Sequence, residues 1–103
     1  MTESELERKL NSVGKSCFVK YYNLFKSYAE HNITKLECIN ALVVDLVSNC
    51  NGAAIRCSNA KKIFEKNMQN KALNIILTSN RIDNEIKEIA NNILENSSFK
   101  EAV

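Results

Sequence analysis

The residues best suited to chemistry in this chain of 103 residues are four cysteines and one histidine: Cys17, Cys38, Cys50, Cys57 and His31. The cysteines are separated by 21, 12 and 7 positions, whereas structural zinc sites use close ligand pairs. A cysteine–histidine nucleophile pair would need His31, which follows an expected helix and suits a helix C-terminus better than a catalytic base. Each cysteine lies in or beside an apolar helical stripe, where it behaves as a small buried hydrophobe. We therefore expect free, largely buried cysteines and no metal site.

Two short segments contain parts of a nucleotide site. Residues 13–16 read Val-Gly-Lys-Ser, like the end of a P-loop, and residues 42–45 read Leu-Val-Val-Asp, like a Walker B strand. The first P-loop glycine is missing because Lys9 occupies its position, and a helix is expected where the motif needs a strand. The sequence also lacks a Gly-x-Ser-x-Gly elbow, and its carboxylates are scattered over faces expected to be solvated. These absences predict a protein that is not an enzyme and binds no cofactor.

Positive charge is densest between residues 51 and 78, where five basic residues and one acid give +4, while the whole chain carries only +2. The segment follows a capped helix and begins with Asn51-Gly52, a turn signal, before a second helix rich in Arg, Ser, Asn and Lys. This is the layout of a helix-turn-helix, whose second helix enters the major groove of DNA. The candidate DNA- or RNA-binding residues are Arg56, Ser58, Asn59, Lys61, Lys62 and Lys66.

The run Arg-Cys-Ser-Asn-Ala-Lys-Lys, residues 56–62, resembles the recognition helix of sigma-factor-like helix-turn-helix domains. The resemblance implies DNA binding through this helix. The alternative is a solvated basic face balanced by residues 79–103, whose formal charges sum to −2. A net charge of +2 is far below that of a dedicated nucleic-acid binder.

Aromatic residues are concentrated in residues 17–28, which hold five of the seven in the chain: Phe18, Tyr21, Tyr22, Phe25 and Tyr28. Tyrosine and phenylalanine are favoured at protein interfaces, and five aromatics exceed what one helix face normally buries. We therefore expect an exposed apolar patch here that binds a protein partner or a second copy of the chain as a homodimer. Simple core packing is the alternative, because aromatic stripes at helical spacing are usually core.

The elements that must position these residues are helices. The chain has no proline and only two glycines, Gly14 and Gly52, too few for the tight turns of a β protein. Apolar residues recur at helical spacing, and Thr34 with Glu37 forms a capping box. We expect an all-α single domain over residues 1–103, an irregular bundle of four to five helices. Their expected ranges are 4–30 (with Gly14 as a candidate break), 34–50, 53 or 58 to 67, 71–78 and 83–96, followed by a frayed tail at 97–103.

No run of 18 apolar residues is present, so we expect no membrane span. The charged N-terminus has no apolar signal core, which predicts a cytoplasmic protein. The leading hypothesis is a small regulatory protein that binds nucleic acid through residues 56–66. The alternative is a protein-interaction module, an inhibitor or adaptor, that uses residues 17–28.

Overall fold

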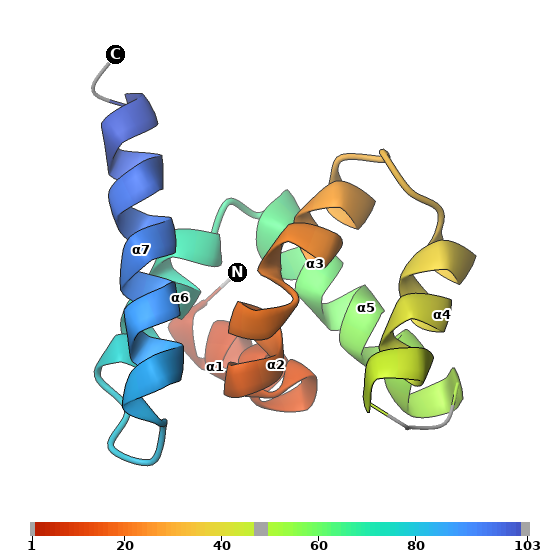
Figure 1. Ribbon diagram of the computed structural model, residues 1–103, viewed down its shortest axis with the longest axis horizontal. Helices are drawn as coiled ribbons and strands as arrows, with labels where there is room; N and C mark the ends of the chain where they lie inside the picture. The colour runs from red at the N-terminus through yellow and green to blue at the C-terminus, as the bar shows by residue number, and fades with distance from the viewer. Residues whose placement is uncertain (1, 47–49, 102–103) are drawn as a thin grey trace.

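The computed structural model describes residues 2–46 and 50–101, which contain seven helices and no strand (Figure 1). The prediction of an all-α fold is confirmed, although the described part of the chain has more helices than the four to five expected. The helices are α1 (Glu3–Val13), α2 (Lys15–Lys20), α3 (Tyr22–Ala29), α4 (Lys35–Leu46), α5 (Cys50–Glu65), α6 (Gln69–Leu77) and α7 (Asn84–Glu101).

The extra helices arise because residues 3–29 form three short helices instead of one long one. Gly14 separates α1 from α2 with a φ of 93°, a conformation that L side chains rarely adopt. The Gly14 amide still donates to the Leu10 carbonyl, at 2.8 Å. A second break, at Tyr21, was not expected. Backbone hydrogen bonds continue across it, from Tyr21 to Cys17 and from Phe25 to Tyr21, so Tyr21 marks a bend in the chain.

Side chains cap the starts of α1 and α4, and the cap of α4 is the one that the sequence predicts. The Thr2 hydroxyl accepts a hydrogen bond from the Glu5 amide at 3.2 Å. At α4 the capping box is complete: the Thr34 amide donates to the Glu37 carboxylate at 3.1 Å, and the Glu37 amide donates to the Thr34 hydroxyl at 3.2 Å. Each pair satisfies amides that the first turn of a helix leaves without a partner.

Two helices end in left-handed residues that are not glycine. His31 follows α3 with a φ of 64°, and Asn67 follows α5 with a φ of 57°. Beyond α5 the Asn67 amide donates to the Phe64 carbonyl and the Met68 amide to the Ile63 carbonyl, both at 3.0 Å. This is the Schellman pattern, and the residues after α3 repeat it. The chain has only two glycines, and at these two helix ends asparagine and histidine occupy the left-handed position that glycine usually fills.

The structure corrects two predicted helix boundaries. Asn51 and Gly52 lie inside α5, so the predicted turn there is wrong. Residues 47–49, which precede α5 in the chain, lie outside the described residues. The predicted end of the last helix at residue 96 is also wrong, since α7 continues to Glu101. No glycine or proline follows Asp83 to end that helix.

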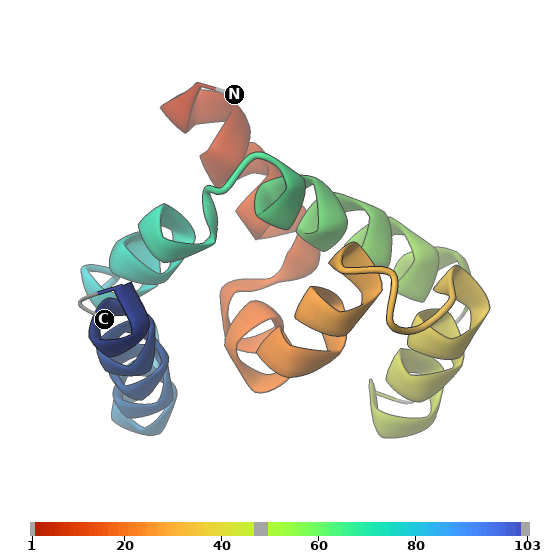
Figure 2. The same ribbon diagram turned by 90° about the horizontal axis from the view of Figure 1, so that it is seen from above.

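α5 is the central helix, and α1, α3 and α4 all pack against it (Figures 1 and 2). α6 and α7 form a helical hairpin on the side away from α4, where α7 contacts α2 and α6 contacts α1. α4 lies at the opposite edge of the molecule (Figure 1). In the described ranges, no helix combines the length and the apolar character that crossing a membrane requires.

Phe18 lies in the middle of the aromatic part of the core and is fully buried. Its ring stacks on Phe25 and Phe64, with centroids 6.4 and 5.7 Å away, and meets the edge of Tyr22 at 5.8 Å. Tyr22 and Phe64 complete the cluster with centroids 5.1 Å apart. These contacts join α2, α3 and α5, so the aromatic segment fixes the central helix in place.

Candidate nucleic-acid interface

Near its C-terminal end, one face of α5 is open to solvent and carries Lys62, and Lys66 follows directly after the last residue of the helix. Lys62 and Lys66 are exposed, and Asn59 is half-buried beside them. At about 100° per residue these three positions fall within a narrow sector of the helix. The opposite side holds the core residues Ala53, Cys57, Ala60 and Ile63, all fully buried. The lysines therefore face solvent because the apolar stripe of the same helix faces the core.

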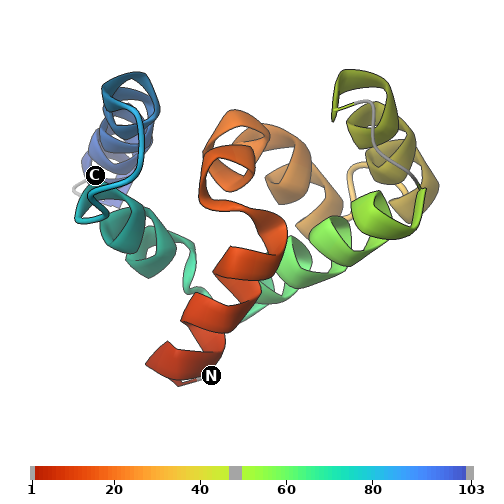
Figure 3. The same cartoon turned by 90° about the horizontal axis from the view of Figure 1, so that it is seen from below.

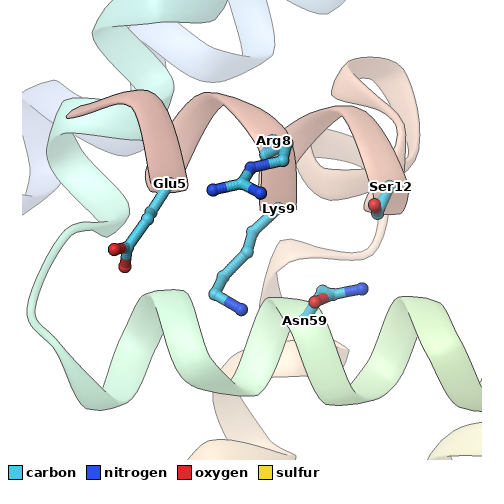
Figure 4. Close-up of a pocket in the computed structure, with 5 residues that line it drawn as sticks. All are labelled: Glu5, Arg8, Lys9, Ser12 and Asn59. Atoms are coloured by element: carbon cyan, nitrogen blue, oxygen red, sulfur yellow. The ribbon is translucent and has the colours of Figure 1, made fainter. Parts of the chain in front are cut away.

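α1 lies alongside the C-terminal part of α5 and adds further charge (Figures 3 and 4). Leu6, Leu10 and Val13 bury one face of α1. Because that face packs into the core, side chains at the edge of the buried face of α1 lie beside α5. In Figure 4 the Lys9 side chain extends from α1 toward α5, and Asn59 rises from α5 toward α1. The α1 residues on this side are Glu5, Arg8, Lys9 and Ser12.

These side chains line two adjoining hollows. The first has a volume of about 280 Å³ and is lined by residues of α1 together with Asn59. The second has a volume of about 680 Å³ and includes Lys62 and Lys66. They share Glu5 and Lys9 and therefore adjoin, and we call the two hollows together the α1–α5 groove. Its lining residues are Glu5, Arg8, Lys9, Ser12, Asn59, Lys62, Glu65 and Lys66.

The groove carries a net positive charge. Arg8, Lys9, Lys62 and Lys66 supply four cations, while Glu5 and Glu65 supply two carboxylates, giving a formal charge of +2 within the lining. Clustered cations with low-dielectric walls raise the local concentration of anions. The polar side chains of Ser12 and Asn59 add hydrogen-bonding groups. This arrangement can bind phosphate oxygens that follow one another along a backbone.

Two of the predicted binding residues point away from this groove. Lys61 places its ammonium 4.9 Å from the centre of the Tyr28 ring, a cation–π contact with α3. Arg56 lies beside Cys17 of α2, where its charge and hydrogen bond favour the thiolate. Burial outweighs Arg56 and raises the pKa of the Cys17 thiol. The structure thus divides the six predicted residues between different faces of α5.

Ser58 is half-buried and is not among the lining residues of the groove. Asn59 lines the groove, and its side-chain amide also donates to the Ile55 carbonyl at 3.0 Å. Three of the predicted residues therefore meet in one place: Asn59, Lys62 and Lys66. Arg8, Lys9 and Ser12 were not predicted from the sequence. The sequence shows that they lie outside the Leu6–Leu10–Val13 stripe, but it does not show that α1 packs against α5.

The surroundings of α5 differ from those of an isolated recognition helix. α1, α3 and α4 flank it on several sides. A helix with its side chains is about 10–12 Å across, and the major groove of DNA is about 12 Å wide. A groove of that width admits one helix, whereas α1 lies beside the part of α5 that carries Lys62, so the basic residues line a depression between two helices.

The aromatic residues predicted as a protein interface belong to the core. Phe18, Tyr22, Phe25 and Tyr28 are buried, and Tyr21 is half-buried. The expectation of an exposed aromatic patch is therefore wrong for four of the five. At about 100° per residue, positions 18, 21, 22, 25 and 28 fall within one sector of about 120°, so a single helical face can turn all five rings toward the core. Burial also raises the pKa of the Tyr22 and Tyr28 hydroxyls.

Cys17, Cys38 and Cys57 are free and buried, as the apolar stripes predict. The Cys50 side chain lies outside the described part of the structure. Among residues 2–46 and 50–101, no group of three or more His, Cys, Asp or Glu side chains is arranged to hold a metal ion. The P-loop-like segment joins α1 to α2, and the Lys15 ammonium donates to the Ser79 hydroxyl at 3.3 Å.

Comparison of the chain with protein-family models, with curated proteins and with solved structures found no match.

Proposed function

We propose that this protein is a non-enzymatic nucleic-acid-binding protein that contacts the phosphate backbone through the α1–α5 groove. The proposal rests on one observation: four cations from the α1 and α5 segments line the α1–α5 groove. They are Arg8, Lys9, Lys62 and Lys66. The two carboxylates in the lining limit its affinity for anions. We therefore propose weak binding that depends on charge and not on base sequence.

The salt dependence of binding tests this proposal. Four phosphate contacts give a slope of roughly −3.6 in a plot of log affinity against log salt concentration, and such binding has dissociation constants of roughly 1–100 μM. Fluorescence anisotropy with a short labelled duplex DNA, and with a duplex RNA of the same sequence, measures the slope. Affinity that does not change between about 50 and 200 mM salt would contradict backbone binding.

A protein-interaction module remains the second candidate, with a different surface from the one expected. The most exposed large apolar side chains in the described ranges are Leu36 and Val44 on α4 and Ile55 on α5, with exposed fractions of 66, 76 and 56%. A protein partner that covered these side chains would remove their apolar surface from water. Phosphate contacts are strong at about 50 mM salt. If neither nucleic acid changes the anisotropy at that salt concentration, the protein-interaction module becomes the leading candidate.

A further inference from the structure

Two buried thiols from different helices are in contact in the core. Cys38 of α4 and Cys57 of α5 have no exposed surface, and their sulfur atoms are 3.0 Å apart. The Cys57 thiol donates its hydrogen to the Cys38 sulfur. The two residues are separated by 19 positions in the chain, so a bond between them would join α4 to α5 directly.

A disulfide requires only a small change from this arrangement. The sulfur–sulfur bond is about 2.05 Å long, so the two atoms must approach each other by about 1 Å. α4 lies at the edge of the molecule and packs on α3 and α5 (Figure 1), so movement of this one helix is enough. No other disulfide has to be broken first, because Cys38, Cys57 and Cys17 are all free.

We propose that Cys38 and Cys57 are a redox modification site, at which a hydroperoxide forms a reversible disulfide that fixes α4 to α5. In the first step the Cys38 thiolate attacks one peroxide oxygen. The oxygen–oxygen bond breaks, the sulfur becomes a sulfenic acid, and the leaving hydroxide takes up the proton that Cys38 released. In the second step the Cys57 sulfur attacks the Cys38 sulfur, the sulfur–oxygen bond breaks, and water leaves with the Cys57 proton. Overall, two thiols and one hydrogen peroxide give one disulfide and two waters.

The order of attack follows from the hydrogen bond. Because the Cys57 thiol donates to it, the Cys38 thiolate is stabilised and the pKa of Cys38 is lowered. The same hydrogen bond and burial raise the pKa of Cys57. Cys38 is thus the attacking sulfur and Cys57 the resolving one. Since both are buried, oxidation proceeds through local opening of the α4–α5 contact and is slower than that of an exposed thiol.

The test uses the full chain with Cys17 and Cys50 both replaced by alanine, which leaves only the Cys38–Cys57 pair. After treatment with hydrogen peroxide, the intact mass is expected to fall by two hydrogens and both free thiols to be lost. Trypsin cuts after Lys35, Arg56 and Lys61, so non-reducing digestion should yield residues 36–56 linked to residues 57–61. Dithiothreitol should restore both thiols.

The matched control is the chain with Cys38 and Cys50 replaced by alanine, which keeps Cys17 and Cys57. It is expected to form no disulfide under the same conditions. Peroxide-treated wild type gives an independent readout that needs no variant. Its tryptic peptide 36–56 contains both Cys38 and Cys50, and fragmentation of the linked peptide shows which of the two is joined to Cys57. Three outcomes would each overturn the proposal. The pair variant could keep two titratable thiols after denaturation, or it could gain oxygen without a crosslink. The control could also form a crosslink equally fast.

Discussion

Replacing Phe18 with alanine is expected to lower the free energy of unfolding by about 3–5 kcal/mol. Phe18 has no exposed surface and contacts the rings of Tyr22, Phe25 and Phe64. Truncation removes its buried apolar area and leaves a cavity among rings that cannot all collapse into it. A domain of this size has a total stability of about 5–15 kcal/mol, so a large share is lost. Thermal denaturation followed by circular dichroism should show a melting temperature lower by about 15 °C or more.

Val44→Ala is the matched control for the Phe18 substitution. The Val44 side chain is 76% exposed on α4, so its truncation removes little buried area and should change stability by less than about 0.5 kcal/mol. Equal melting temperatures for Phe18→Ala and wild type would show that the aromatic cluster does not hold the fold together. In that case the assignment of residues 17–28 to the core would be wrong.

Replacing Lys62 and Lys66 together with glutamate is expected to abolish nucleic-acid binding. Both side chains are exposed and line the same hollow. Two phosphate contacts are lost and two carboxylates now repel the backbone, so an interaction of roughly micromolar strength or weaker at the start falls below detection. Because each phosphate contact contributes about −0.9 to the salt slope, the milder Lys62→Ala/Lys66→Ala variant should halve that slope, to roughly −1.8.

The control for charge reversal must change the net charge equally at another place. Lys35→Glu with Arg81→Glu does so, because both residues are exposed and neither lines the groove. This control should keep most of the binding. All variants should keep the wild-type circular dichroism spectrum, since the replaced side chains are solvated. Equal losses of affinity in the two double variants would assign binding to net charge and not to the groove.

Local signals in the sequence predict much of this fold. The Thr34 and Glu37 pair identifies the start of α4 because both capping hydrogen bonds form between residues three apart. Gly14 marks a break because its backbone conformation suits glycine alone. Lys62 and Lys66 fall on one solvated face because the apolar stripe of α5 determines which side is buried. Each of these inferences uses interactions within a few residues of chain.

What the sequence could not show depends on packing between distant segments. Asn51-Gly52 is a turn signal by local preference, yet it lies within α5. That helix is stabilised along its length by α1, α3 and α4, and tertiary contacts of this kind override propensity. Arg8 and Lys9 join the candidate site for the same reason: α1 lies beside α5, some fifty residues away in the chain.

The most direct test of the α1–α5 groove is a nuclear magnetic resonance titration of the isotopically labelled protein with a short duplex DNA at about 50 mM salt, where phosphate contacts are strong. We predict that the amide shifts concentrate in residues 5–12 of α1 and in residues 59–66 at the end of α5, and that they disappear as salt is raised. Shifts confined to α4 or α7, or no shifts at any DNA concentration, would contradict binding in the groove.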